Sequence, residues 1–233
     1  CCVMTLTHSR QMIGIREQIL SIFLGYNNWW QIAQDASYFS RLTGASPFTH
    51  LWFLGVEMQF YLIWPLLFYL YKKIFRLPGR KRACFFFLIP AFLSLAAMIC
   101  LYHPGSDPSR VYYGTDTMGF TLFLGMFLGA LRHNYPVLCT PVSRKRQLPV
   151  FSGMFGITLL LFLLVKGSNS FLYLGGMFVI SVFFAVMILF TENQRTLAQE
   201  LPLASQTALL GKYSYNIYLW HYPVIVLLLT AFH

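Results

Sequence analysis

The chain has 233 residues, of which 57% are hydrophobic and only 10% are charged, and its mean hydropathy is +0.59. This composition excludes an ordinary soluble domain and indicates an integral membrane protein built from helices. A net charge of +10 would suggest a nucleic-acid partner in a soluble protein. Here the placement of the basic residues explains it, so we expect membrane lipid and no nucleic acid as a partner.

Apolar windows long enough to cross a bilayer predict an all-α, polytopic helical bundle that forms one membrane domain over residues 1–233. Residues 1–6 resemble the end of an earlier span, and residues 7–49 are rich in aromatic and amide side chains suited to the membrane interface. About six complete transmembrane helices are expected after that. They fall at 51–71, 83–102, 118–132, 149–166, 171–191 and 210–230.

Basic residues predict the orientation of the bundle. The loop 72–82 holds six basic and no acidic residues, and the loop 132–149 holds four basic ones. The positive-inside rule places both loops in the cytoplasm and His50 at the opposite surface. We therefore expect a multi-pass protein of the inner (plasma) membrane.

Five cysteines, at positions 1, 2, 84, 100 and 139, form no metal-binding motif, so they are interpreted as small hydrophobic residues and no metal is expected. The chain starts with a short apolar run and without methionine. We interpret it as an internal fragment that lacks its first helices and its last.

The first complete span is unusually polar, because it carries Glu57, Gln59 and Tyr61. A carboxylate in the bilayer costs at least about 2.5 kcal/mol, so Glu57 should face protein or a water-filled cavity. Seven residues return the helix to nearly the same face, which puts His50 about 10 Å from Glu57 along the axis. The alternatives are that Glu57 forms a buried ion pair and that His50 is a hydrated residue at the helix start, after a Ser46 or Thr49 cap.

Two later segments hold further candidates. Asp116 is either a site residue or a helix cap. It precedes a glycine-rich span in which Gly125 and Gly129 form a GxxxG step that favours helix packing. His221 lies near the middle of the last span, where it is either a site residue or a satisfied core histidine. Pro223 should kink that span.

Three blocks of the chain resemble the membrane-bound acyltransferase family 3, the O-acetyltransferases of lipopolysaccharide, peptidoglycan and other surface glycans. Residues 50–65, HLWFLGVEMQFYLIWP, are similar to the family signature H-x-W-S-L-x-V-E-x-Q-F-Y-L-x-W-P. Residues 113–117, YGTDT, resemble its Y-x-x-T-D-T-R segment, and residues 211–223 resemble its G-x-x-S-Y-x-x-Y-L-x-H-x-P ending. Phe53, Met58 and Met118 depart from these patterns. The family's first helices, with an arginine and a histidine regarded as central to acyl transfer, have no counterpart.

The resemblance implies transfer of an acyl group, most often acetyl from acetyl-CoA, to a hydroxyl of a surface polysaccharide or glycolipid. It implies catalytic roles for Glu57 and His50. The same resemblance implies substrate-binding roles for a larger set, namely Trp52, Gln59, Tyr61, Asp116, Tyr215 and His221. The alternative function is a multi-pass transporter or carrier of a lipid-linked glycan, in which the same polar groups would line a pathway without acyl chemistry.

Overall fold

The computed structural model describes residues 15–38, 46–74, 81–135, 143–193 and 204–231, and these ranges are helical with short connections. Expectations about residues 1–14, about three of the cysteines and about residues 75–80 and 136–142 of the basic loops fall outside them. The amino-terminal part consists of α2 (Ile15–Phe23), α3 (Asn27–Ala33), the 3-10 turn η2 (Thr49–Leu51) and the long α4 (Trp52–Ile74). Neither Ser46 nor Thr49 caps η2 through its side chain.

The central part begins with η3 (Lys81–Phe87) and α5 (Leu88–Leu101). Two short helices, α6 (Ser109–Tyr113) and α7 (Thr115–Met118), then lead into α8 (Phe120–Asn134). The final part consists of α9 (Arg144–Leu164), the wide turn η5 (Leu172–Gly176), α10 (Met177–Asn193) and α12 (Ala204–Ala231).

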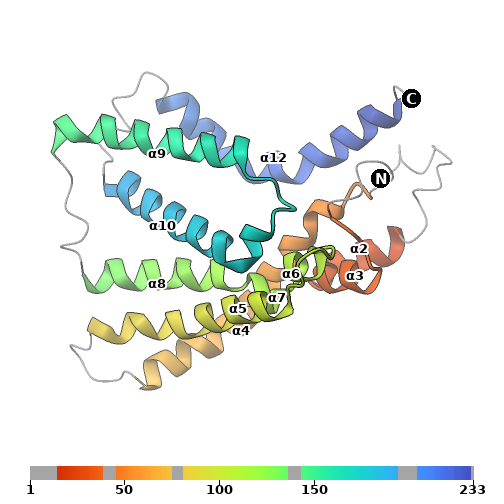
Figure 1. The fold of residues 1–233 in the computed structure, drawn as a ribbon, viewed down its shortest axis with the longest axis horizontal. Helices are drawn as coiled ribbons and strands as arrows, with labels where there is room; N and C mark the ends of the chain where they lie inside the picture. The colour runs from red at the N-terminus through yellow and green to blue at the C-terminus, as the bar shows by residue number, and fades with distance from the viewer. Residues whose placement is uncertain (1–14, 39–45, 75–80, 136–142, 194–203, 232–233) are drawn as a thin grey trace.

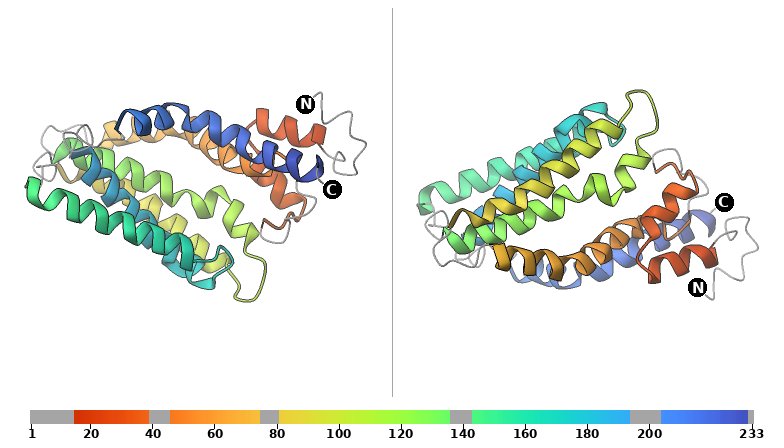
Figure 2. Two further views of the ribbon diagram at one scale, coloured as in Figure 1. Left: turned by 90° about the horizontal axis from the view of Figure 1, so that it is seen from above. Right: turned by 90° about the horizontal axis from the view of Figure 1, so that it is seen from below.

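The helices form two layers. In the views of Figure 2, α5, α8, α9 and α10 run in one layer, while α4 and α12 lie in the other. Figure 1 shows that α2, α3, α6 and α7 gather at the end of the bundle where α4 begins. The opposite end is tied by an ion pair between Arg132 at the end of α8 and Glu192 at the end of α10. The short helices are therefore concentrated at the end where the signature block starts.

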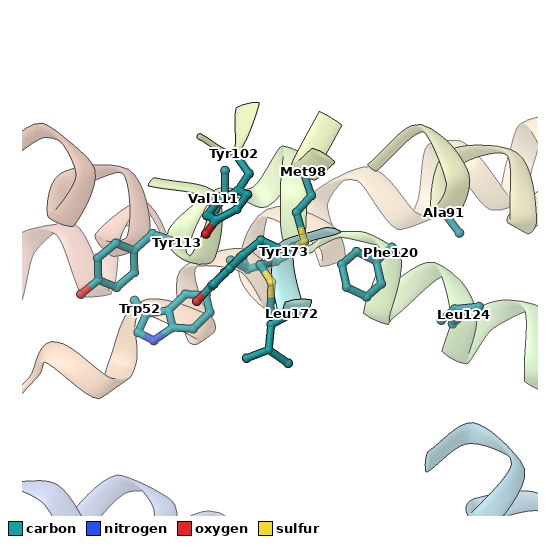
Figure 3. Packing of buried hydrophobic residues seen from close by; sticks show 12 residues of the cluster. Trp52, Ala91, Met98, Tyr102, Val111, Tyr113, Phe120, Leu124, Leu172 and Tyr173 are labelled. Carbon is teal, nitrogen blue, oxygen red and sulfur yellow. The ribbon is translucent and has the colours of Figure 1, made fainter. Parts of the chain in front are cut away.

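Buried aromatic and aliphatic side chains from both layers meet next to the end of the bundle that holds the short helices (Figure 3). Trp52 of α4 packs against Tyr112 and Tyr113 of α6, with ring centroids 4.8 and 5.4 Å apart. Tyr102 stacks on Tyr173 of η5 at 4.9 Å. This core connects the start of α4 to α5, α6, α8 and η5, so it holds the polar residues of α4 in a defined position.

Four helical segments in the described ranges are long and apolar enough to cross a membrane: Thr49–Ile74, Cys84–Leu101, Lys145–Leu164 and Leu172–Glu192. The expectation of about six spans is not confirmed. At 15 residues α8 measures only about 22 Å, which is short for a hydrocarbon core of about 30 Å. The 28-residue α12 is long enough, but it carries Lys212, Asn216, His221 and several tyrosines, which lower its hydropathy.

The GxxxG step in α8 does not mark a close helix contact. A Cβ atom added at Gly125 or Gly129 would meet nothing within 4 Å. Close approach occurs instead at Gly55, where an added Cβ would lie 2.8 Å from Asn28 Oδ1 and 3.3 Å from the backbone nitrogens of Asn27 and Asn28. The start of α3 therefore rests directly on α4 one half-turn before Glu57, and the absence of a side chain at position 55 makes that possible.

Candidate active site

His50 occupies a buried position at the start of α4, in the turn η2, and is only 8% exposed. Its ring lies against three side chains of α12, with centroid distances of 5.4 Å to Tyr218, 5.1 Å to His221 and 5.4 Å to Tyr222. The hydroxyl of Tyr218 donates a hydrogen bond to the backbone oxygen of His50 at 2.7 Å. The structure thus brings the first and third signature blocks, 168 residues apart, into contact.

The imidazole of His50 faces backbone groups of Pro47, Tyr218 and Leu219 without forming a well-aligned hydrogen bond. Within the described residues neither Nδ1 nor Nε2 has a hydrogen-bond partner. Most buried polar atoms in proteins are paired, and an unpaired one costs about 1–3 kcal/mol. The ring is covered by protein at the start of α4 and lies beside a second imidazole.

His221 has a defined orientation. Its Nδ1 lies 2.7 Å from the backbone oxygen of Tyr218. A carbonyl oxygen only accepts, so Nδ1 carries the proton, and in the neutral ring Nε2 holds the lone pair. The side chain is exposed within the described structure, so it is not a satisfied core histidine. Its free nitrogen can accept a proton from a bound hydroxyl.

Glu57 is half-buried on the face of α4 opposite Gly55 and Gln59, and its carboxylate interacts electrostatically with the phenol of Tyr218. Among the described residues it forms no ion pair, and the interpretation of Glu57 as a buried helix-joining pair has no support there. His50, Glu57, Tyr218 and His221 together form what we call the imidazole cluster.

Gln59 lies outside the imidazole cluster and joins three helices. Its Nε2 donates to the backbone oxygen of Gly25 at 2.8 Å and to Asn28 Oδ1 at 2.9 Å. Its Oε1 accepts from Trp29 Nε1 at 3.1 Å and from Thr115 Oγ1 at 2.6 Å. All donors and acceptors of this amide are therefore occupied by protein, which makes Gln59 a positioning residue that fastens α3 and α7 to α4.

Three other predicted site residues are not brought to the imidazole cluster by any recorded contact. Trp52 is buried in the core against Tyr112 and Tyr113, so it offers no free ring face for a substrate. Tyr61 and Tyr215 are exposed large side chains on α4 and α12. Neither has a recorded contact with His50, although Tyr215 lies three residues before Tyr218 and interacts with it electrostatically.

Asp116 pairs with Arg110 rather than capping a helix. The Arg110 nitrogens Nη1 and Nη2 lie 3.2 and 3.0 Å from the two carboxylate oxygens. Neither α7 nor α8 has a side-chain cap. Arg110, Asn28 and Tyr218 were not predicted as site residues. The sequence does show that Asn28 and Tyr218 are polar residues within aromatic segments. It does not show their contacts, because their partners are distant in sequence.

A second polar connection lies in the loop before α6. Partial burial would raise the pKa of the Asp107 carboxyl, but hydrogen bonds from the hydroxyls of Ser109 and Ser37 and from the Ser109 N–H hold that pKa below its ordinary value. The Ser109 hydroxyl oxygen also accepts from the N–H of Tyr38 at 2.8 Å. This network joins the segment after α3 to the loop before α6.

In the described ranges no three His, Cys, Asp or Glu side chains are arranged to hold a metal ion. The groups available for chemistry are two imidazoles, one carboxylate and a phenol at the end of a helical bundle. This combination is suited to proton transfer to and from a hydroxyl.

The sequence profile of a family described as an acyltransferase domain matches residues 19–233, and the chain belongs to this family of membrane acyltransferases. The match includes all members of the imidazole cluster and the residues bonded to Gln59.

Curated relatives are O-acetyltransferases. The chain is 36% identical over 216 residues to the putative peptidoglycan O-acetyltransferase YrhL of Bacillus subtilis, covering 91% of this chain and 34% of the relative. It is 34% identical over 225 residues to the peptidoglycan O-acetyltransferase OatA of Listeria monocytogenes, covering 94% and 35%. A putative O-acetyltransferase of Staphylococcus aureus is 31% identical over 222 residues, covering 94% and 36%. The chain spans about a third of the length of these relatives, and no solved structure matches it.

Proposed function

We propose that this membrane domain takes part in transferring an acetyl group to a hydroxyl of a cell-surface glycan, with peptidoglycan as the acceptor. The single observation that carries the proposal is the contact between His50 and His221, which brings together residues of separate signature blocks. The similarity to O-acetyltransferases supports acetyl transfer, and two of these relatives are named for peptidoglycan as the acceptor. They favour peptidoglycan over lipopolysaccharide as the acceptor.

The proposed chemistry uses the imidazole cluster to move one proton. A glycan hydroxyl attacks the carbonyl carbon of the acetyl group, and its proton passes to an imidazole nitrogen such as the free Nε2 of His221. The carboxylate of Glu57 stabilises the positive charge that forms on the ring. The bond between the acetyl carbon and the sulfur of the proposed acetyl-CoA donor breaks, and the departing thiolate takes up the proton that the imidazole accepted, which returns the ring to its neutral form. His50, buried and unpaired, is proposed to position the hydroxyl.

Acetyl-CoA is the proposed donor, as the family resemblance implies. Exposed basic side chains at the end of the bundle opposite His50, including Lys72, Lys73 and Lys145, support binding of a phosphate-bearing donor there. The glycan would then be reached from the outer surface and the donor from the cytoplasm. Such an arrangement requires a protein of the plasma membrane.

The complete topology is also part of the proposal. We propose that α8 and α12 cross the membrane together with the four long apolar helices, which gives the six expected crossings. The basic residues at the end of α8, Arg132 and His133, support placing that end in the cytoplasm. Labelling of single cysteines introduced at positions 134 and 211 from each side of the membrane tests this topology. Labelling of both from the outside would overturn it.

The direct test supplies membranes containing the protein with labelled acetyl donor and measures label on the glycan. Label on glycan that depends on Glu57 supports acyl transfer. Movement of a lipid-linked glycan across the membrane without any label on it would support the alternative transporter function and overturn the proposal. Both measurements can be made on the same membrane preparation.

A further inference from the structure

Three partly exposed side chains form a compact surface at the end of the bundle that carries His50. They are Trp29 of α3, Arg110 of α6 and Asp116 of α7. The guanidinium carbon of Arg110 lies 5.2 Å from the centroid of the Trp29 ring, and both of its terminal nitrogens bond Asp116. Trp29 is 37% exposed, and the side chains of Arg110 and Asp116 are 40% and 38% exposed. We call these three residues the Trp29 platform.

The platform is held rigidly from below. The indole nitrogen of Trp29 donates to Gln59 Oε1 at 3.1 Å, so the ring is fixed by the same amide that fastens α3 and α7 to α4. Gly114 lies directly beneath the ion pair, and an added Cβ there would collide with Arg110 Nη1, Asp116 Oδ1 and Thr117 Oγ1. A preorganised surface of this kind loses little conformational entropy when it binds a ligand.

Stability of the fold does not explain the platform. An exposed ion pair contributes at most about 1 kcal/mol, because solvent screens it and both side chains lose freedom. Its donors, its acceptors and part of the Trp29 ring are accessible, so the platform can bind a ligand at the surface as well as join the helices.

The chemistry of the platform fits a saccharide. The ion pair is neutral overall. Asp116 occupies two of the five guanidinium N–H groups of Arg110. The remaining N–H groups and the free lone pairs of the carboxylate can bind neighbouring hydroxyls. A sugar hydroxyl both donates and accepts, and the apolar C–H face of a pyranose packs against an indole ring. An anionic group would instead meet repulsion from the carboxylate of Asp116.

We propose that Trp29, Arg110 and Asp116 form a saccharide-binding site that holds the acceptor glycan at the outer end of the bundle. This inference rests on the proposed function and specifies where its acceptor binds. It assigns the stacking surface to Trp29, since Trp52, which was predicted to bind substrate, is buried in the core.

The test measures binding of a soluble peptidoglycan glycan tetrasaccharide to the purified protein in phosphatidylcholine nanodiscs by isothermal titration calorimetry. Trp29→Ala should weaken binding on the order of 10-fold, because stacking is lost. Trp29→Phe keeps a ring and should bind within a few-fold of wild type, although it loses the bond to Gln59. Asp116→Asn should also weaken binding. Trp220→Ala, which removes an exposed tryptophan of α12, is the matched control and should bind like wild type.

Two outcomes would overturn the inference. One is tetrasaccharide affinity that is unchanged in both Trp29→Ala and Asp116→Asn. The other is unchanged sugar affinity together with a loss of binding to phosphatidylglycerol vesicles, which would identify the platform as a membrane-interface anchor. Acetyl transfer is measured separately. Transfer that persists at wild-type rates in Trp29→Ala contradicts the binding site and leaves the proposed function intact. Sugar binding by the wild-type protein without any acetyl transfer contradicts the proposed function and leaves the binding site intact.

Discussion

The two faces of α4 differ in how their polar groups are satisfied. One face carries Gly55 and Gln59, lies against α3 and α7, and has every amide atom of Gln59 hydrogen-bonded. The other face carries Glu57, and His50 lies directly before it in η2. Among the described residues neither ring nitrogen of His50 is hydrogen-bonded. The first face therefore builds the fold, and under the proposed function the unpaired nitrogens of the second face serve to bind the acceptor hydroxyl.

The largest effect is expected from Glu57→Gln on the second face. The substitution keeps the shape of the side chain and removes its charge, so acetylation of the glycan should fall by at least about 100-fold, within the range typical of general acid–base groups. Label on glycan in isolated membranes is the measurement. Protein level in the membrane should stay unchanged, and full acetylation by this variant would remove the carboxylate from the mechanism.

Gly55→Ala should damage the first face. The new methyl group would press on Asn28 Oδ1 and on the backbone at the start of α3, and overpacking of this kind costs about 1–3 kcal/mol. Thermal unfolding in detergent would report the loss. Gly125→Ala is the matched control, since a Cβ atom there meets nothing within 4 Å, and it should unfold at or above the wild-type temperature. Equal effects of the two substitutions would contradict the close contact.

Tyr218→Phe tests the link between α12 and the second face. It removes the hydroxyl that donates to the backbone oxygen of His50 at 2.7 Å, which should cost about 1 kcal/mol and loosen α12 at this point. Hydrogen exchange of the segment around His50 should become faster. Tyr215→Phe is the control, because Tyr215 is exposed and has no recorded contact with His50, and it should leave exchange unchanged.

The smallest effect is expected at low pH in the loop before α6. The pKa of Asp107 is lowered in the folded protein, so its contribution to stability is present above its ordinary value of 3.8 and is lost as the pH falls through the lowered pKa. Limited proteolysis at pH 3 and pH 7 should show increased cleavage near this loop at pH 3. In Ser109→Ala the increase should begin at higher pH, since hydrogen bonds from Ser109 are removed. An unchanged onset would show that Ser109 does not lower the pKa.

Much of the fold follows from local sequence. Apolar windows predicted the four long spans well, because a helix that crosses a bilayer needs only length and apolar side chains. Two expectations depend on more than composition: the six spans are not confirmed, and the close packing at the GxxxG step is wrong. The polar residues of α12 lower its hydropathy, and the GxxxG step of α8 lies away from any close neighbour, since spacing alone does not say which helix packs opposite.

Sequence alone determined that an imidazole and a carboxylate lie seven residues apart in a segment long enough to span a membrane, and a rotation of about 100° per residue predicts one shared face for them. Only the tertiary structure decided that His221 completes this face, that Gln59 is occupied as a structural link and that Trp52 is buried while Trp29 is open. Those outcomes depend on contacts between residues dozens to more than a hundred positions apart, and the packing of the whole bundle determines which of them form.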